Sequence, residues 1–112
     1  MLIFYRLENL FKNWVKHGDF NFYTSNIYEL DLSNYPTSKI MFLIFKHNGT
    51  NNNNSMWFIS NYFDVNYQAA YKMFEMNGSF NMTATPLNNF KIKFTIDTPR
   101  QYGGSIYLFF LN

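Results

Sequence analysis

The chain has 112 residues, which is the length of one domain. It contains no cysteine, so disulfides, thiolate zinc sites and thiol nucleophiles are excluded. Its net charge of +2 is too small to suggest the clustered basic surface of a duplex DNA binder. Aromatic residues make up 22 % of the chain against 14 % charged residues, so rings can supply most of a hydrophobic core.

The first eighteen residues differ in pattern from the rest. Four large apolar residues at spacings of four, three and four fall on one helical stripe: Ile3, Leu7, Leu10 and Trp14. Gly18 follows as a residue that can end a helix. The pattern predicts a helix within residues 1–18, docked on the domain as a lid or forming the stub of a self-associating stalk. An extended strand is the third alternative.

From residue 19 the chain alternates between strands and turns. The predicted strands are Asp19–Tyr23, Ile27–Leu32, Ile40–Phe45, Met56–Phe63, Tyr71–Met76, Ser79–Ala84, Phe90–Asp97 and Ser105–Leu111. In Phe90–Asp97 apolar residues strictly alternate with polar ones, which is typical of a strand with one face in water. Ile40–Phe45 is apolar throughout, which fits a strand covered on both faces. Short strands at this spacing predict a mainly β domain over residues 19–112, an antiparallel β-sandwich or jelly roll of about six to eight strands.

Turn-forming residues separate these strands. Pro36 ends one strand, and His47–Ser55 is a polar stretch that predicts a long hairpin tip. Asn77-Gly78 is the preferred pair for a two-residue type I′ turn. It predicts a hairpin with the pairs Glu75–Phe80, Met73–Met82 and Tyr71–Ala84. Gly103-Gly104 predicts a bulge or a tight corner.

No pair of groups is spaced for catalysis. His17 and His47 lie thirty positions apart without a His or Cys partner, so neither a metal site nor a triad is predicted. Glu29 and Asp31 share a strand face, which is more typical of a solvated surface than of a glycosidase pair. We therefore expect no enzyme activity, no catalytic residue, no metal and no cofactor. We also expect no membrane span, because no long apolar run occurs, and no secretion signal, because Met1–Tyr5 lacks a basic region and a small-residue cleavage site.

Surface binding is the remaining class of function. In Phe90–Phe94 the rings and the lysines face opposite ways, which argues against a nucleic-acid groove. Surplus aromatic residues suit a sugar-stacking platform or a protein interface: Trp57, Tyr62, Tyr67 and Tyr102. The predicted contact loop contains Asn48, Asn51, Asn52, Asn53, Asn54 and Trp57.

The C-terminal part of the chain resembles a known kind of β-domain. A short turn joins residues 89–96 to residues 102–112, and the second segment opens with a small-residue corner. This pattern is similar to the closing strand pair of bacteriophage fibre tips and related virion β-domains. The resemblance implies a non-enzymatic virion structural or attachment protein, located in the virion, although the stalk is too short for a free-standing fibre.

This resemblance also implies partners. We expect a homo-oligomer, with a trimer favoured, that contacts other virion proteins and has a cell-surface glycan as a candidate ligand. The predicted oligomer interface contains Ile3, Leu7, Leu10, Trp14, Ile106, Leu108 and Phe110, with Ile106–Leu111 at the core or at the subunit junction. The alternative is a small, soluble, monomeric β binding module for a glycan or a single-stranded nucleic acid.

Overall fold

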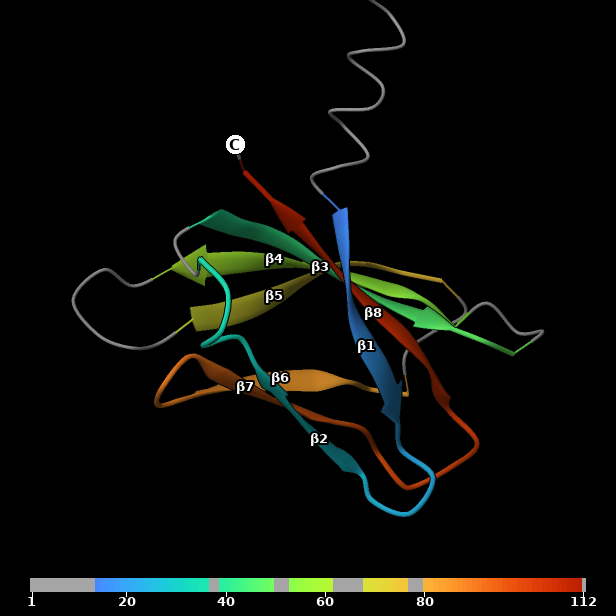
Figure 1. Ribbon diagram of the computed structural model, residues 1–112. Coiled ribbons are helices and arrows are strands. Elements are labelled where there is room, and N and C mark those ends of the chain that lie inside the picture. Colours follow the sequence, from blue (N-terminus) through green and yellow to red (C-terminus); the bar gives the residue numbers. More distant parts are fainter. Residues whose placement is uncertain (1–13, 37–38, 50–52, 62–67, 77–79, 112) are drawn as a thin grey trace, which may run out of the picture.

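The computed structural model describes residues 14–36, 39–49, 53–61, 68–76 and 80–111. They form eight strands: β1 (Trp14–Asn21), β2 (Ile27–Asp31), β3 (Ile40–His47), β4 (Ser55–Asn61), β5 (Gln68–Glu75), β6 (Thr83–Leu87), β7 (Lys91–Thr95) and β8 (Gly103–Phe110). All strand pairs are antiparallel. One sheet has the order β1-β8-β3-β4-β5 and the other β2-β7-β6 (Figure 1). The mainly β prediction is thus confirmed for the described residues.

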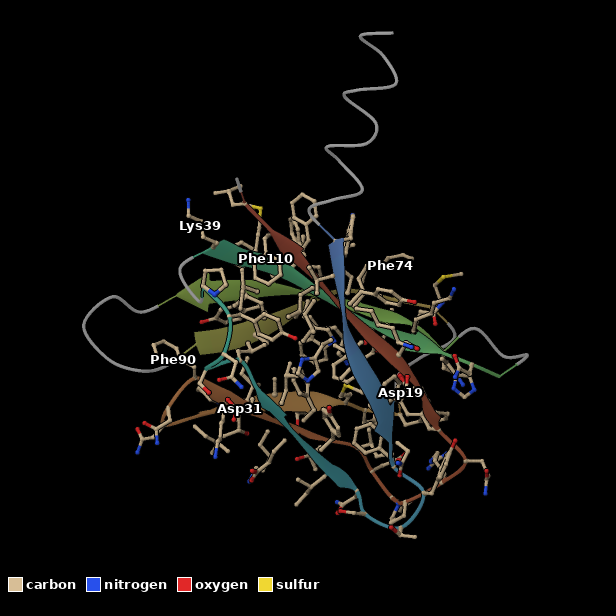
Figure 2. All side chains as sticks on the ribbon, viewed as in Figure 1. Asp19, Asp31, Lys39, Phe74, Phe90 and Phe110 are labelled. Carbon is tan, nitrogen blue, oxygen red and sulfur yellow. The ribbon has the colours of Figure 1, made fainter. Side chains whose placement is uncertain are left out.

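The two sheets face each other across an aromatic core. The Phe94 ring of β7 meets Phe45 of β3 and Trp57 of β4, with ring centroids 4.7 and 5.2 Å apart. Tyr28 of β2 also contacts Phe45, at 6.5 Å. Side chains from both sheets fill the space between them (Figure 2). The core is therefore shared by the two sheets.

The three-stranded sheet has the polar outer face that its sequence predicts. Phe94 is fully buried. On the other face of the sheet, Lys93 lies opposite Glu29 of β2, and Lys91 lies opposite Asp31. Opposite charges at paired positions stabilise neighbouring strands and leave a hydrophilic surface.

The final strand, β8, is enclosed between β1 and β3. Gly104 lies opposite Phe20 of β1 and His47 of β3. A Cβ at Gly104 would overlap the main-chain carbonyl oxygen of Lys46, so only glycine fits here. The Gly103-Gly104 pair thus opens a paired strand at a close approach of two backbones, and the predicted bulge or corner is wrong.

The predicted N-terminal helix is wrong where the structure describes it. Trp14–Gly18 belong to β1, where Trp14 lies opposite Phe109 and Gly18 opposite Ile106. The register shifts between Lys16 and Gly18, so His17 is the extra residue of a β-bulge. Pairing with β8 overrides the helical spacing, and β1 runs across the predicted boundary between residues 18 and 19. Ile3, Leu7 and Leu10 lie outside the described residues.

The predicted hairpin between Tyr71–Met76 and Ser79–Ala84 is also wrong. β5 pairs with β4 and β6 pairs with β7, so the two segments belong to different sheets. Phe80 and Asn81, with φ angles of 54° and 56°, turn the chain between the sheets. The pairs Glu75–Phe80, Met73–Met82 and Tyr71–Ala84 are therefore not formed. Asn77-Gly78 lies outside the described residues.

The two C-terminal segments that resemble a closing strand pair are not paired with each other. β7 lies between β2 and β6, whereas β8 lies between β1 and β3 in the opposite sheet. The turn through residues 97–102 carries the chain from one sheet to the other. Both segments are strands, as predicted, but the pairing that the resemblance implies is absent.

Candidate functional site

The outer face of the five-stranded sheet carries an aromatic residue on every strand. Trp14, Phe109, Phe42, Phe58 and Tyr71 occupy paired positions on β1, β8, β3, β4 and β5. Paired residues of neighbouring strands point to the same side of a sheet, so the five rings form one row. Ring centroids are 5.0 Å apart for Trp14–Phe109, 5.9 Å for Phe42–Phe109 and 6.2 Å for Phe42–Phe58. We call these five residues the aromatic row.

A second row lies one pleat further along the sheet. It consists of Lys16, Tyr107, Ile44, Met56 and Phe74, which are again paired from strand to strand. We call the two rows together the outer apolar face. Its only charged side chain is Lys16, whose Nζ lies 3.3 Å from an Asp19 carboxylate oxygen.

The outer apolar face is accessible in the single chain. Phe58, Tyr71 and Phe74 are 39 %, 53 % and 59 % exposed, and the other six apolar residues are half-buried. With about 200 Å² for a fully exposed aromatic side chain, the face presents roughly 500 Å² of apolar surface. Patches of this size are at the upper end for soluble monomers and are often functional.

The rings of the aromatic row do not form a flat platform. The planes of neighbouring rings meet at 59° for Trp14–Phe109, 46° for Phe42–Phe109 and 66° for Phe42–Phe58. A sugar or a nucleobase stacks on a ring face, whereas tilted rings interlock with the side chains of another protein surface. The face therefore fits an apolar protein partner better than a glycan or a nucleic acid.

The interface residues predicted on β8 lie on the wrong side of the strand. Ile106 and Leu108 are fully buried between the sheets, and Phe110 packs against the same core. Of the two predicted placements, the core and the subunit junction, these residues occupy the core. They offer no surface to a second subunit. Their neighbours Tyr107 and Phe109 point outward instead. Sequence analysis missed these two because the run Ile106–Leu111 is apolar on both faces.

Two residues of the predicted contact loop are structural. Trp57 is 2 % exposed and its Nε1 donates to Ser55 Oγ at 2.9 Å. Asn53 is 7 % exposed, and its carbonyl oxygen accepts from the buried Tyr102 hydroxyl at 2.8 Å. These contacts fix the start of β4, so the contact prediction is wrong for both residues.

The rest of the predicted loop is only partly described. Asn48 is exposed, and the Asn54 side-chain oxygen accepts from the His47 main-chain N–H at 2.8 Å. Asn51 and Asn52 lie outside the described residues, as do Tyr62 and Tyr67. The contact-loop prediction thus remains a prediction for Asn48, Asn51, Asn52 and Asn54.

Tyr102, predicted as a surplus aromatic residue, belongs to the core. Its ring stacks on Phe22, with centroids 5.7 Å apart and planes at 12°. Burial raises the pKa of Tyr102. Its hydroxyl therefore stays protonated and acts as the hydrogen-bond donor to Asn53.

The two histidines lie apart, each with a structural partner. The Tyr35 hydroxyl is 2.7 Å from His17 Nδ1, and burial lowers the pKa of His17 while nearby Asp31 opposes this shift. His47 Nδ1 donates to the Gly103 carbonyl oxygen at 2.9 Å. Among the described residues no group of three or more His, Cys, Asp or Glu could hold a metal ion. In the same part of the chain we find no helix with the length and hydropathy to cross a membrane.

Searches of protein-family models, curated proteins and solved structures found no match to this chain.

Proposed function

We propose that this chain is a non-enzymatic structural protein that works by self-association through its outer apolar face. The observation that carries the proposal is the aromatic row, which places an accessible ring on all five strands of one sheet. Burying apolar surface contributes roughly 25 cal/mol per Å², so covering this face would strongly favour association.

We further propose that the fold is a β-sandwich of the jelly-roll kind. The first strand pairs with the last in one sheet, and the second pairs with the seventh in the other. This nesting of chain ends is what a jelly roll has, and the β4–β5 hairpin widens the first sheet.

A virion structural or attachment protein is the specific role that we propose. Jelly rolls build viral capsid and lectin domains, and a protein that self-associates can form the symmetric assemblies that a virion role requires. The resemblance described above rests on the strand pattern of residues 89–96 and 102–112 alone, because β7 and β8 lie in opposite sheets and do not pair with each other. Other virion proteins are then the further partners of the assembled form.

The monomeric glycan or nucleic-acid module receives less support from the geometry. The tilted rings offer no stacking platform, and Lys16 is the only cation on the outer apolar face. Salt-sensitive retention of a monomer on heparin would favour that alternative.

The self-association proposal is tested by Phe58→Asp with Ile27→Asp as the matched control. Phe58 and Ile27 are 39 % and 43 % exposed strand residues on the outer faces of opposite sheets. Light scattering should give the wild type a mass of more than one chain, Phe58→Asp a lower mass, and Ile27→Asp the wild-type mass. A wild type that is monomeric at every concentration, or equal effects of the two variants, would contradict the proposal.

A further inference from the structure

We propose that the occupant of the outer apolar face is a second copy of the same chain, bound face to face about a two-fold axis. This inference rests on the proposed self-association and names its partner surface and symmetry. The axis lies in the plane of the interface, crosses the strands, and runs between the two rows. Each aromatic row then packs on the second row of the other copy.

The width of the face selects a sheet as its occupant. Five strands at about 4.8 Å spacing make a face about 19 Å wide from β1 to β5. An extended peptide covers one strand width, and a helix of about 10 Å diameter covers half of the face. Another sheet of the same width covers all of it, and sheets pack face to face at about 10 Å. This chain itself carries such a sheet.

The apolar area of the face accounts for more than half of a standard interface. A standard interface buries about 800 Å² per partner, and the nine apolar residues alone present roughly 500 Å². Met73, the unpaired residue at the register shift between Phe74 and Lys72 on β5, is 57 % exposed. The hydrophobic centre of an interface is normally surrounded by a more polar rim that supplies the remainder.

Charges select the direction of the axis. Beyond the second row the outer face becomes polar, because Asp19, Ser105 and Lys46 occupy the next paired positions. An axis along β3 would stack Lys46 on Lys46 of the partner subunit. An axis across the strands places the polar row outside the contact and Lys16 against Trp14 of the partner subunit, which is a favourable cation–π contact.

The opposite side of the molecule explains why association would stop at two copies. The outer face of the three-stranded sheet carries the cross-strand pairs Glu29–Lys93 and Asp31–Lys91. With the two apolar faces covered by each other, these polar faces form both outer surfaces. An isologous contact of this kind closes, so we infer a dimer in place of the trimer expected from the sequence.

The chain has no cysteine, so a single introduced cysteine can carry a spin label at one chosen site. Lys46 is exposed on β3, three residues from the inferred axis at Leu43. Strand rise and sheet spacing then place the two Lys46→Cys backbones about 22 Å apart. An axis along β3 would bring them to about 10 Å. Thr85→Cys, on the outer face of β6, is the control and should give 30 Å or more, from three sheet spacings of about 10 Å.

Pulsed electron paramagnetic resonance on both labelled variants, with light scattering of each, completes the test. A dimer with distances near these values supports the inference. A larger oligomer that is still disrupted by Phe58→Asp would overturn the two-fold pair and leave the proposed function standing. A dimer with close Thr85→Cys labels that Phe58→Asp does not disrupt would overturn both. A monomer would also overturn both, and would mean that no second copy occupies the face.

Discussion

Tyr102 joins the start of β4 to the core through one hydroxyl. The hydroxyl donates to the Asn53 carbonyl oxygen at 2.8 Å, and the ring is enclosed by Phe22 and Phe80. Tyr102→Phe keeps the ring and removes the hydrogen bond, so we expect the free energy of unfolding to fall by about 1 kcal/mol. Urea unfolding measures the change. The control Tyr23→Phe, at a residue 51 % exposed, should stay within about 0.5 kcal/mol. Equal stability of the two variants would show that the bond contributes nothing.

His17 makes folding stability depend on pH. Burial lowers the pKa of His17 in the folded chain, and unfolding restores its ordinary value of 6.5. The unfolded chain therefore binds a proton at a higher pH than the folded chain does. The contribution of neutral His17 to the free energy of unfolding is complete above pH 6.5. It is lost as the pH falls from 6.5 toward the lowered pKa of His17 in the folded chain.

His17→Gln should remove this part of the pH dependence. Urea unfolding of wild type and variant at about pH 7.5 and about pH 5.5 measures it, and the wild type should lose more stability on acidification. Hydrogen bonds from Ser33 lower the pKa of Asp31, so its contribution is lost only below its ordinary value of 3.8 and does not enter this window. An identical loss in both proteins would rule out His17 as the cause.

Phe94 packs β7 against the opposite sheet. Its ring meets Phe45 and Trp57 within 5.2 Å. Phe94→Ala leaves a cavity between the sheets, and we expect a loss of about 3 to 5 kcal/mol in the free energy of unfolding. Thr95→Ala, the next residue on the outer side of β7, should change it by less than about 1 kcal/mol. Similar losses for both would mean that Phe94 does not join the sheets.

Alternation decides which strands can be predicted from sequence. In β7 every second residue is polar, and in β2 Glu29 and Asp31 alternate with Tyr28 and Leu30, so both strands and their buried faces follow from the pattern. In β8 both faces are apolar, because one lines the core and the other forms part of the outer apolar face. The sequence then predicts a strand but not its buried side, so the pattern does not distinguish Ile106 and Leu108 from Tyr107 and Phe109 as outward-facing residues.

The wrong predictions of an N-terminal helix and of a hairpin at Asn77-Gly78 both arise because strand pairing is long-range. Trp14 fits a helical stripe, but its neighbour in β8 is 95 positions later and invisible to local patterns. The local pattern around Asn77-Gly78 likewise predicts a hairpin. In the structure, however, β5 pairs with β4, and β6 pairs with β7. The outer apolar face is made of residues from five strands, so only the strand order brings it together.

The whole molecule has two unlike outer surfaces. The three-stranded sheet presents paired charges, whereas the five-stranded sheet presents the outer apolar face. A soluble monomer gains nothing from an accessible row of five aromatic residues, and each costs free energy in water. The proposed pair of copies would cover the apolar surface and leave the charged one outside.

The solution mass of the full chain tests this claim most directly. Light scattering across a range of concentrations should give the wild type twice the mass of one chain, with Phe58→Asp reduced to one chain and Ile27→Asp unchanged. A wild type that has the mass of one chain at the highest concentration would contradict self-association through the outer apolar face.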